Sequence, residues 1–163
     1  MTHATAHLVS EVLTREALAQ QLEADRAAGL TVGFANGCFD ILHVGHVRYL
    51  QAAAAEADRL VVAVNADASV RRLKGPSRPI LDETARTGMV AALRGVDYVV
   101  LFDADTVADL LTRLKPDVHC KGTDYTVETV PERAIVQAYG GRTAICGDPK
   151  DHSTRDLVKR ILG

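Results

Sequence analysis

The stretch T-V-G-F-A-N-G-C-F-D-I-L-H-V-G-H, residues 31–46, decides how the rest of the chain folds. It begins as an apolar run at Val32 and breaks at the pair Asn36 and Gly37. Apolar residues then recur with helical spacing over residues 44–57. The sequence therefore predicts a strand, a tight loop and a helix in direct succession.

The start of that helix carries two histidines, His43 and His46. Backbone N–H groups and the positive end of the helix dipole favour an anion at such a position. Gly45 lies between the histidines and lets another molecule's phosphate come close, because it has no side chain. We therefore expect this loop to bind a polyphosphate and to stabilise charge that develops on it.

Length, composition and charge limit the classes of protein to consider. With 163 residues the chain fits one domain that can bury a proper core. Hydrophobic residues make up 47% and aromatic residues only 4%, which suits a parallel sheet covered by helices. The formal charge is −2, without a block of like charge, so we expect neither a nucleic-acid partner nor a membrane partner.

The three cysteines, Cys38, Cys120 and Cys146, are widely spaced and form no C-x-x-C motif. This pattern indicates reduced thiols and a cytoplasmic protein. Residues 1–10 lack the features of a signal peptide, and no apolar run reaches membrane-spanning length. Cys38 lies in the loop described above, where packing under the loop is favoured over a role as nucleophile.

Strand-like and helix-like segments alternate along the whole chain, which predicts an α/β fold with right-handed crossovers. We expect a Rossmann-like, doubly wound parallel sheet of about five strands, with helices on both faces, in a single domain. Expected strands after the first are residues 59–65, 96–102, 117–120 and 142–146. Expected helices are residues 14–28, 44–57, 68–73, 82–94, 105–114, 131–139 and a last one from about 153.

Polar residues follow several of these strands directly. Asn65 ends the apolar run at 59–65 and Asp67 follows it, and K-G-T-D-Y at residues 121–125 follows the strand at 117–120. Ligands of doubly wound sheets bind beyond the carboxyl ends of the strands, so we expect these residues near the loop after the first strand. For Asp67, capping of the next helix is an equally good interpretation.

A turn-rich linker, K-G-P-S-R-P at residues 74–79, carries two cations. Because Gly75 and the two prolines exclude a helix, we expect Lys74 and Arg78 on a loop that can fold over an anionic ligand. Arg86 follows near the start of the next helix, where an exposed i, i+4 partner is an alternative role.

Several of these motifs together resemble a known family. N-G-C-F-D at residues 36–40, followed by H-V-G-H at residues 43–46, resembles the H-x-G-H signature of the nucleotidyltransferase (cytidylyltransferase-like) superfamily. The K-G-x-x-R-P and K-G-x-D-Y segments are most similar to those of the heptose 1-phosphate adenylyltransferases, which make ADP-heptose. The last helix starts with Ser153, Thr154 and Arg155, where that family has S-T-T, so one hydroxyl is replaced.

The resemblance implies a set of site residues and substrates. We expect residues 1–30 to form an N-terminal segment with a leading helix, and residues 31–163 to form a stand-alone nucleotidyltransferase domain. The implied catalytic residues are His43, His46 and Lys74. The implied nucleotide and phosphate contacts are Asn36, Gly37, Phe39, Asp40, Gly45, Lys121, Gly122, Asp124, Ser153 and Thr154. The implied sugar-phosphate contacts are Asn65, Asp67, Arg78 and Arg86.

The implied substrates are ATP and a sugar 1-phosphate. We expect Mg²⁺ to accompany the ATP, without a cage of carboxylates built by the protein. A homo-oligomer is expected, with a dimer favoured. One alternative is a cytidylyltransferase for a polyol phosphate such as glycerol 3-phosphate, and another is a nucleotide-binding regulatory protein without catalysis. The G-x-G-x-x-G fingerprint of NAD-binding proteins is missing from the sequence.

Overall fold

A parallel six-stranded sheet forms the centre of the molecule, which we describe from a computed structural model covering residues 11–149 and 153–163. The strand order is β1-β4-β3-β2-β5-β6. The strands are β1 (Glu11–Leu13), β2 (Val32–Gly37), β3 (Arg59–Asn65), β4 (Tyr98–Phe102), β5 (Val118–Gly122) and β6 (Arg142–Cys146). The predicted doubly wound α/β fold is therefore confirmed.

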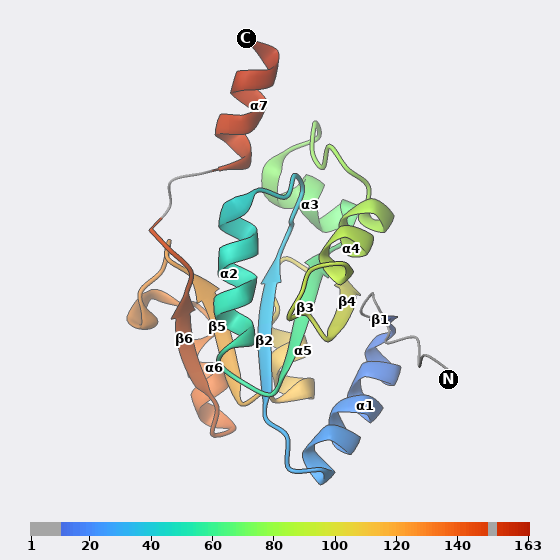
Figure 1. Cartoon of the computed structure of the whole chain (residues 1–163), viewed down its shortest axis with the longest axis vertical. Helices are drawn as coiled ribbons and strands as arrows, with labels where there is room; N and C mark the ends of the chain where they lie inside the picture. Colours follow the sequence, from blue (N-terminus) through green and yellow to red (C-terminus); the bar gives the residue numbers. More distant parts are fainter. Residues whose placement is uncertain (1–10, 150–152) are drawn as a thin grey trace, which may run out of the picture.

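Helices cover both faces of this sheet (Figure 1). The helices of the described residues are α1 (Arg15–Ala27), α2 (Val44–Ala54), α3 (Asp67–Lys74), α4 (Glu83–Ala91), α5 (Ala108–Leu114), α6 (Arg133–Ala138) and α7 (Thr154–Leu162), with a 3-10 turn, η1, at Val127–Thr129. Leu50 of α2 and Val90 of α4 belong to the core on one face. Leu18 of α1, Leu111 of α5 and Val136 of α6 belong to the core on the other.

The sheet has one strand more than the expected five. The additional strand, β1, pairs in parallel with β4 in the register Glu11 to Tyr98 and Leu13 to Val100. It is only three residues long, and two of them are exposed, so it carries no apolar pattern of its own. Its hydrogen bonds come from a strand more than eighty residues later, which a local pattern does not reveal.

The topology brings the site residues together at one edge of the sheet. The chain passes from β2 to β3 and β4 on one side, and then returns to place β5 and β6 on the other side of β2. This switch lies between β2 and β5, and ligands bind beyond the strand ends at such a switch. Figure 1 shows α7 projecting beyond this same edge, and no residue of α7 is buried.

One expected loop position is wrong. Lys74 is the last residue of α3 rather than part of the linker, and Gly75, with φ of 99°, ends the helix. The linker therefore begins one residue later than the sequence suggested, and below the name covers residues 75–81, between α3 and the N-cap residue of α4. Within residues 11–149 and 153–163, no helix is long and apolar enough to span a membrane.

Candidate active site

The loop between β2 and α2 has a tightly restricted backbone. Phe39 adopts φ of 48°, a left-handed conformation that is uncommon for a bulky residue. This conformation turns its ring back over Gly37, where a Cβ atom would lie 3.1 Å from the ring. A side chain at residue 37 would therefore crowd the Phe39 ring, and the chain leaves β2 in a sharp turn that leads to the two histidines.

His43 and His46 lie together at the start of α2. His43 is the N-cap residue of the helix, and its Nδ1 accepts a hydrogen bond from the Gly45 N–H at 3.1 Å. A neutral His43 ring must then carry its proton on Nε2, so it can donate from that atom. The two imidazole rings stack with centroids 3.9 Å apart, and the Phe39 ring contacts His46 edge-on at 5.4 Å. These contacts hold the two histidine rings in one arrangement relative to each other.

A cavity of about 1140 Å³ opens beside these histidines, at the carboxyl edge of the sheet. It is lined by the β2–α2 loop, α2, the end of α3, the linker, the ends of β5 and β6, and the start of α7. Thirteen residues that the sequence singled out line it: Asn36, Gly37, Phe39, His43, Gly45, His46, Lys74, Arg78, Lys121, Gly122, Asp124, Ser153 and Thr154.

Asn36 is held from behind by a buried histidine. His119 of β5 is completely buried, and its Nε2 lies 3.2 Å from Asn36 Oδ1. Burial lowers the pKa of His119 to about 3, and the nearby Lys121 adds to this effect, so the ring is neutral at physiological pH. With its proton on Nε2, His119 donates to Asn36 Oδ1 and fixes the side-chain amide at the cavity wall.

The β5 end supplies a cation and an aromatic ring. The Lys121 ammonium lies 4.7 Å from the centroid of the Tyr125 ring, a cation–π distance. Burial lowers the pKa of Lys121, an effect that Glu132 opposes. Tyr49 of α2 reaches across to β5 and donates to the Cys120 carbonyl oxygen at 2.7 Å. These contacts hold the β5 side of the cavity in place.

The start of α7 forms another part of the cavity. Ser153 is its N-cap residue, and its Oγ accepts a hydrogen bond from the Asp156 N–H at 3.1 Å. Thr154 Oγ1 lies 3.5 Å from the Ile41 carbonyl oxygen in the β2–α2 loop. Arg155, which replaces the second threonine of the family pattern, is exposed and also lines the cavity. The N-terminus of a second helix therefore faces the same space as that of α2.

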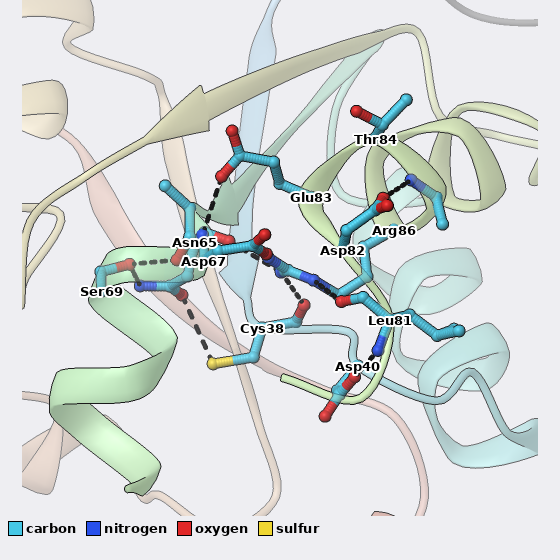
Figure 2. Close-up of polar contacts among 12 residues, drawn as sticks. Cys38, Asp40, Asn65, Asp67, Ser69, Leu81, Asp82, Glu83, Thr84 and Arg86 are labelled. Carbon is cyan, nitrogen blue, oxygen red and sulfur yellow. Dashed lines mark hydrogen bonds and ion pairs between the residues drawn. The ribbon is translucent and has the colours of Figure 1, made fainter. Parts of the chain in front are cut away.

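Four of the expected site residues do not line this cavity: Asp40, Asn65, Asp67 and Arg86. Arg86 is completely buried, so the alternative of an exposed i, i+4 partner is wrong. Asp67 does not cap α3, because the N-cap residue is Ala66. All four side chains instead bind groups of the protein itself, as Figure 2 shows for the network around Arg86.

Twelve residues outside the expected set of site residues also line the cavity: Cys38, Arg48, Tyr49, Leu73, Thr123, Tyr125, Cys146, Gly147, Asp148, Pro149, Arg155 and Asp156. Gly147 and Asp148 directly follow β6, so the rule that drew attention to Asn65 applies equally to them. Arg48 lies in the middle of α2 and forms an ion pair with Asp148 at 3.3 Å. No local signal marks Arg48, because its partner is a hundred residues away.

Cys38 lies at the cavity wall without the features of a nucleophile. Burial raises the pKa of its thiol, and this effect outweighs the nearby charges of Lys74 and Arg86. Its Sγ lies 3.8 Å from Asn65 Oδ1. A thiol with a raised pKa is mostly protonated near neutral pH and reacts slowly.

Comparison with known proteins agrees with this geometry. The profile of a family described as cytidylyltransferase-like matches residues 34–159. This range includes the linker, the start of α7 and the β2–α2 loop with its two histidines, which we call the histidine loop. The chain belongs to this cytidylyltransferase-like family. The resemblance drawn from the H-V-G-H motif is therefore confirmed.

Its relatives in the family include bifunctional proteins named HldE. The chain is 49% identical over 162 residues to HldE of Syntrophotalea carbinolica, covering 99% of this chain and 33% of that protein. It is 52% identical over 161 residues to HldE of Bradyrhizobium diazoefficiens, covering 97% of this chain and 33% of that protein. The chain thus spans about a third of the length of the curated relatives it matches.

A solved structure supports the fold assignment. The crystal structure of the lipopolysaccharide core biosynthesis protein from Thermoplasma volcanium superposes with a TM-score of 0.64 and 29% sequence identity. The match covers 75% of this chain and all of that one.

Proposed function

We propose that this cytidylyltransferase-like chain transfers the adenylyl group of ATP to a heptose 1-phosphate, giving ADP-heptose and pyrophosphate. The observation that carries the proposal is the arrangement of the cavity. The stacked pair His43 and His46 shares one space with two cations, Lys74 and Arg78, and with the N-terminus of α7. Groups that bind phosphate thus line the cavity from several sides, as two highly charged substrates require.

In the proposed reaction an oxygen of the sugar 1-phosphate attacks the α-phosphorus of ATP, and pyrophosphate leaves in line. No protein side chain becomes covalently attached, so the protein contributes mainly positioning and stabilisation of charge. His43 and His46 donate hydrogen bonds to phosphate oxygens as charge develops on the bridging oxygen. Lys74 and Arg78 hold phosphate groups on the opposite side. Ser153 and Thr154 bind the outer phosphates at the start of α7.

The cavity also fits a magnesium ion that arrives with ATP. Among the described residues, no three histidine, cysteine, aspartate or glutamate side chains form a cluster that could hold a metal ion. The cavity carboxylates from which a protein ligand would come are Asp124, Asp148 and Asp156. Mg²⁺ keeps several waters and is commonly held by substrate phosphates plus one or two carboxylates, so this sparse set is sufficient. The bound ion would neutralise part of the phosphate charge.

Two features favour ATP and heptose 1-phosphate over CTP and glycerol 3-phosphate. The first is the pair of segments K-G-x-x-R-P and K-G-x-D-Y, both of which line the cavity in part. The second is the sequence identity of 49% and 52% to two HldE proteins across nearly the whole chain. The product is a precursor for lipopolysaccharide or another surface glycan. We place the reaction in the cytoplasm, where ATP is made, and propose a homodimer as the working form.

A substrate panel tests the proposal. The protein is incubated with ATP or CTP, each combined with heptose 1-phosphates of both anomers or with glycerol 3-phosphate, and pyrophosphate release is followed. Turnover should be far faster for ATP with one heptose 1-phosphate than for any CTP combination. Preferential use of CTP would refute the adenylyltransferase assignment, and no turnover with any pair would favour a regulatory protein.

A further inference from the structure

Arg86 lies inside the protein, at the meeting point of several loops (Figure 2). Its Nε donates to the Leu81 carbonyl oxygen at 3.0 Å, and its Nη1 donates to the carbonyl oxygens of Cys38 and Asn65 at 2.6 and 2.7 Å. Its Nη2 donates to Asp67 Oδ1 at 2.8 Å, which pairs its charge. Four of its five N–H donors thus bind groups of the protein, and the side chain has no exposed surface with which to contact a substrate.

The partners of Arg86 come from three separate segments. Cys38 belongs to the histidine loop, Asn65 and Asp67 flank the junction of β3 and α3, and Leu81 ends the linker. Only a guanidinium group can donate hydrogen bonds to all of these acceptors at once, because its donors are fixed in a planar fork. A lysine ammonium is a compact point charge and does not reach the same acceptors together.

Asp40 holds the same linker residue from the other side. Its carboxylate is almost completely buried and accepts hydrogen bonds from the Leu81 and Ile80 N–H groups, each at 2.9 Å. Arg78 Nε also donates to it, at 2.7 Å. Burial by itself would raise the pKa of Asp40, but these hydrogen bonds outweigh it and lower the pKa. The peptide groups of Leu81 are therefore fixed on both sides, by Asp40 at the N–H and by Arg86 at the carbonyl oxygen.

We name the arrangement of Asp40, Leu81 and Arg86 the Leu81 clamp. Its hydrogen bonds hold both ends of one segment. Residues 67–81 begin at Asp67, which binds Arg86, and end at Leu81, which binds Arg86 and Asp40. The segment carries two of the cations that line the cavity, Lys74 and Arg78. Arg86 also binds the histidine loop through Cys38. The position of the cations relative to the histidines thus depends on Arg86.

We propose that Arg86 and Asp40 are positioning residues that fix Lys74 and Arg78 opposite His43 and His46, rather than contacts to a substrate. The catalytic part of this inference rests on the proposed function. The contacts of Asp40 and Arg86 divide the linker into two parts. Pro76 and Ser77 are exposed and can adjust to a ligand, whereas Ile80 and Leu81 are held before any ligand binds.

Hydrogen exchange in the free protein tests the clamp without any substrate. Ile80 is 51% exposed, yet its N–H should exchange slowly, together with that of Leu81, because both bind a buried carboxylate. In Asp40→Asn and Arg86→Lys both amides should exchange much faster. Arg72→Met is the matched control, since Arg72 forms two exposed ion pairs on α3 and should leave both amides slow. Fast exchange of both amides in the wild type would overturn the clamp.

Kinetics of the same variants test positioning. Misplacement of catalytic groups by about 1 Å can cost about 100-fold in rate, so kcat should fall by about that factor while the Kd for ATP stays near the wild-type value. Arg86→Lys combined with Asp40→Asn should cost little more than either change alone, because both release the same segment. Asp40→Asn leaves the four contacts of Arg86 in place, and it tests the clamp if the Arg86 variants fail to fold.

Two kinetic results would contradict the positioning role of Arg86 and Asp40. A raised KM for the sugar phosphate with unchanged kcat in Arg86→Lys would show direct contact and overturn the proposal. Multiplicative losses in the double variant would also overturn it. If the wild-type protein turned over no substrate pair, the proposed function would fail, while the exchange experiment would still decide the clamp.

Discussion

Acidification should destabilise this protein through His119. Burial lowers the pKa of His119 to about 3, whereas the unfolded chain has a histidine pKa of about 6.5. The unfolded state therefore binds a proton between these values and the folded state does not, so stability falls as the pH falls below 6.5. At pH 5 the gap of about 1.5 pH units corresponds to about 2 kcal/mol, and the full loss below pH 3 approaches about 5 kcal/mol. For a chain of this length, about 2 kcal/mol corresponds to a Tm lower by roughly 4–8 °C.

Urea denaturation at pH 7 and pH 5 measures this effect. The wild-type protein should lose about 2 kcal/mol more between the two pH values than His119→Gln, because groups such as Asp40 titrate in both proteins and cancel. Thr143→Val is the matched control. Thr143 pairs with His119 across β5 and β6 and does not titrate, so this variant should keep the wild-type pH dependence. An equal loss in wild type and His119→Gln would refute the reasoning that the fold keeps this histidine neutral.

The remaining predictions concern the cavity. His43→Ala and His46→Ala should each lower kcat and kcat/KM together by about 100- to 1000-fold with little change in the Kd for ATP, as measured by steady-state kinetics and calorimetry; near-normal turnover would show that the loop is only a scaffold. Lys74→Met should lower kcat/KM by a similar factor, whereas Arg72→Met on the same helix should stay within about twofold of wild type. Equal losses in these two variants would mean that α3 acts through its overall charge.

Much of the fold follows from local patterns in the sequence. The apolar run at Val32, the break at Asn36 and Gly37, and the helical spacing after His43 predict β2, the loop and α2 correctly. These features are local, because each depends on residues within one strand or a few helical turns. β1 differs, since its three residues gain their hydrogen bonds from β4 far along the chain.

The same distinction between local and distant interactions explains which site residues could be predicted from the sequence. Residues at the carboxyl ends of strands, such as Lys121 in the last part of β5, line the cavity as the topology rule predicts. Arg86 is different, because an arginine on an amphipathic helix normally faces water. What buries it are the carbonyl oxygens of Cys38 and Asn65, 48 and 21 residues away in sequence. The direction of those carbonyl groups is set only when the loops fold. The sequence alone therefore does not show that Arg86 binds groups of the protein instead of a substrate.

The most direct test of the central claim follows the oxygen atoms of the transferred phosphate. Heptose 1-phosphate labelled with ¹⁸O in its phosphate is incubated with ATP and the protein, and the products are weighed by mass spectrometry. If the sugar phosphate attacks the α-phosphorus of ATP directly, ADP-heptose retains all of the label and pyrophosphate carries none. Label in pyrophosphate, loss of label to water, or release of AMP without ADP-heptose would contradict the account.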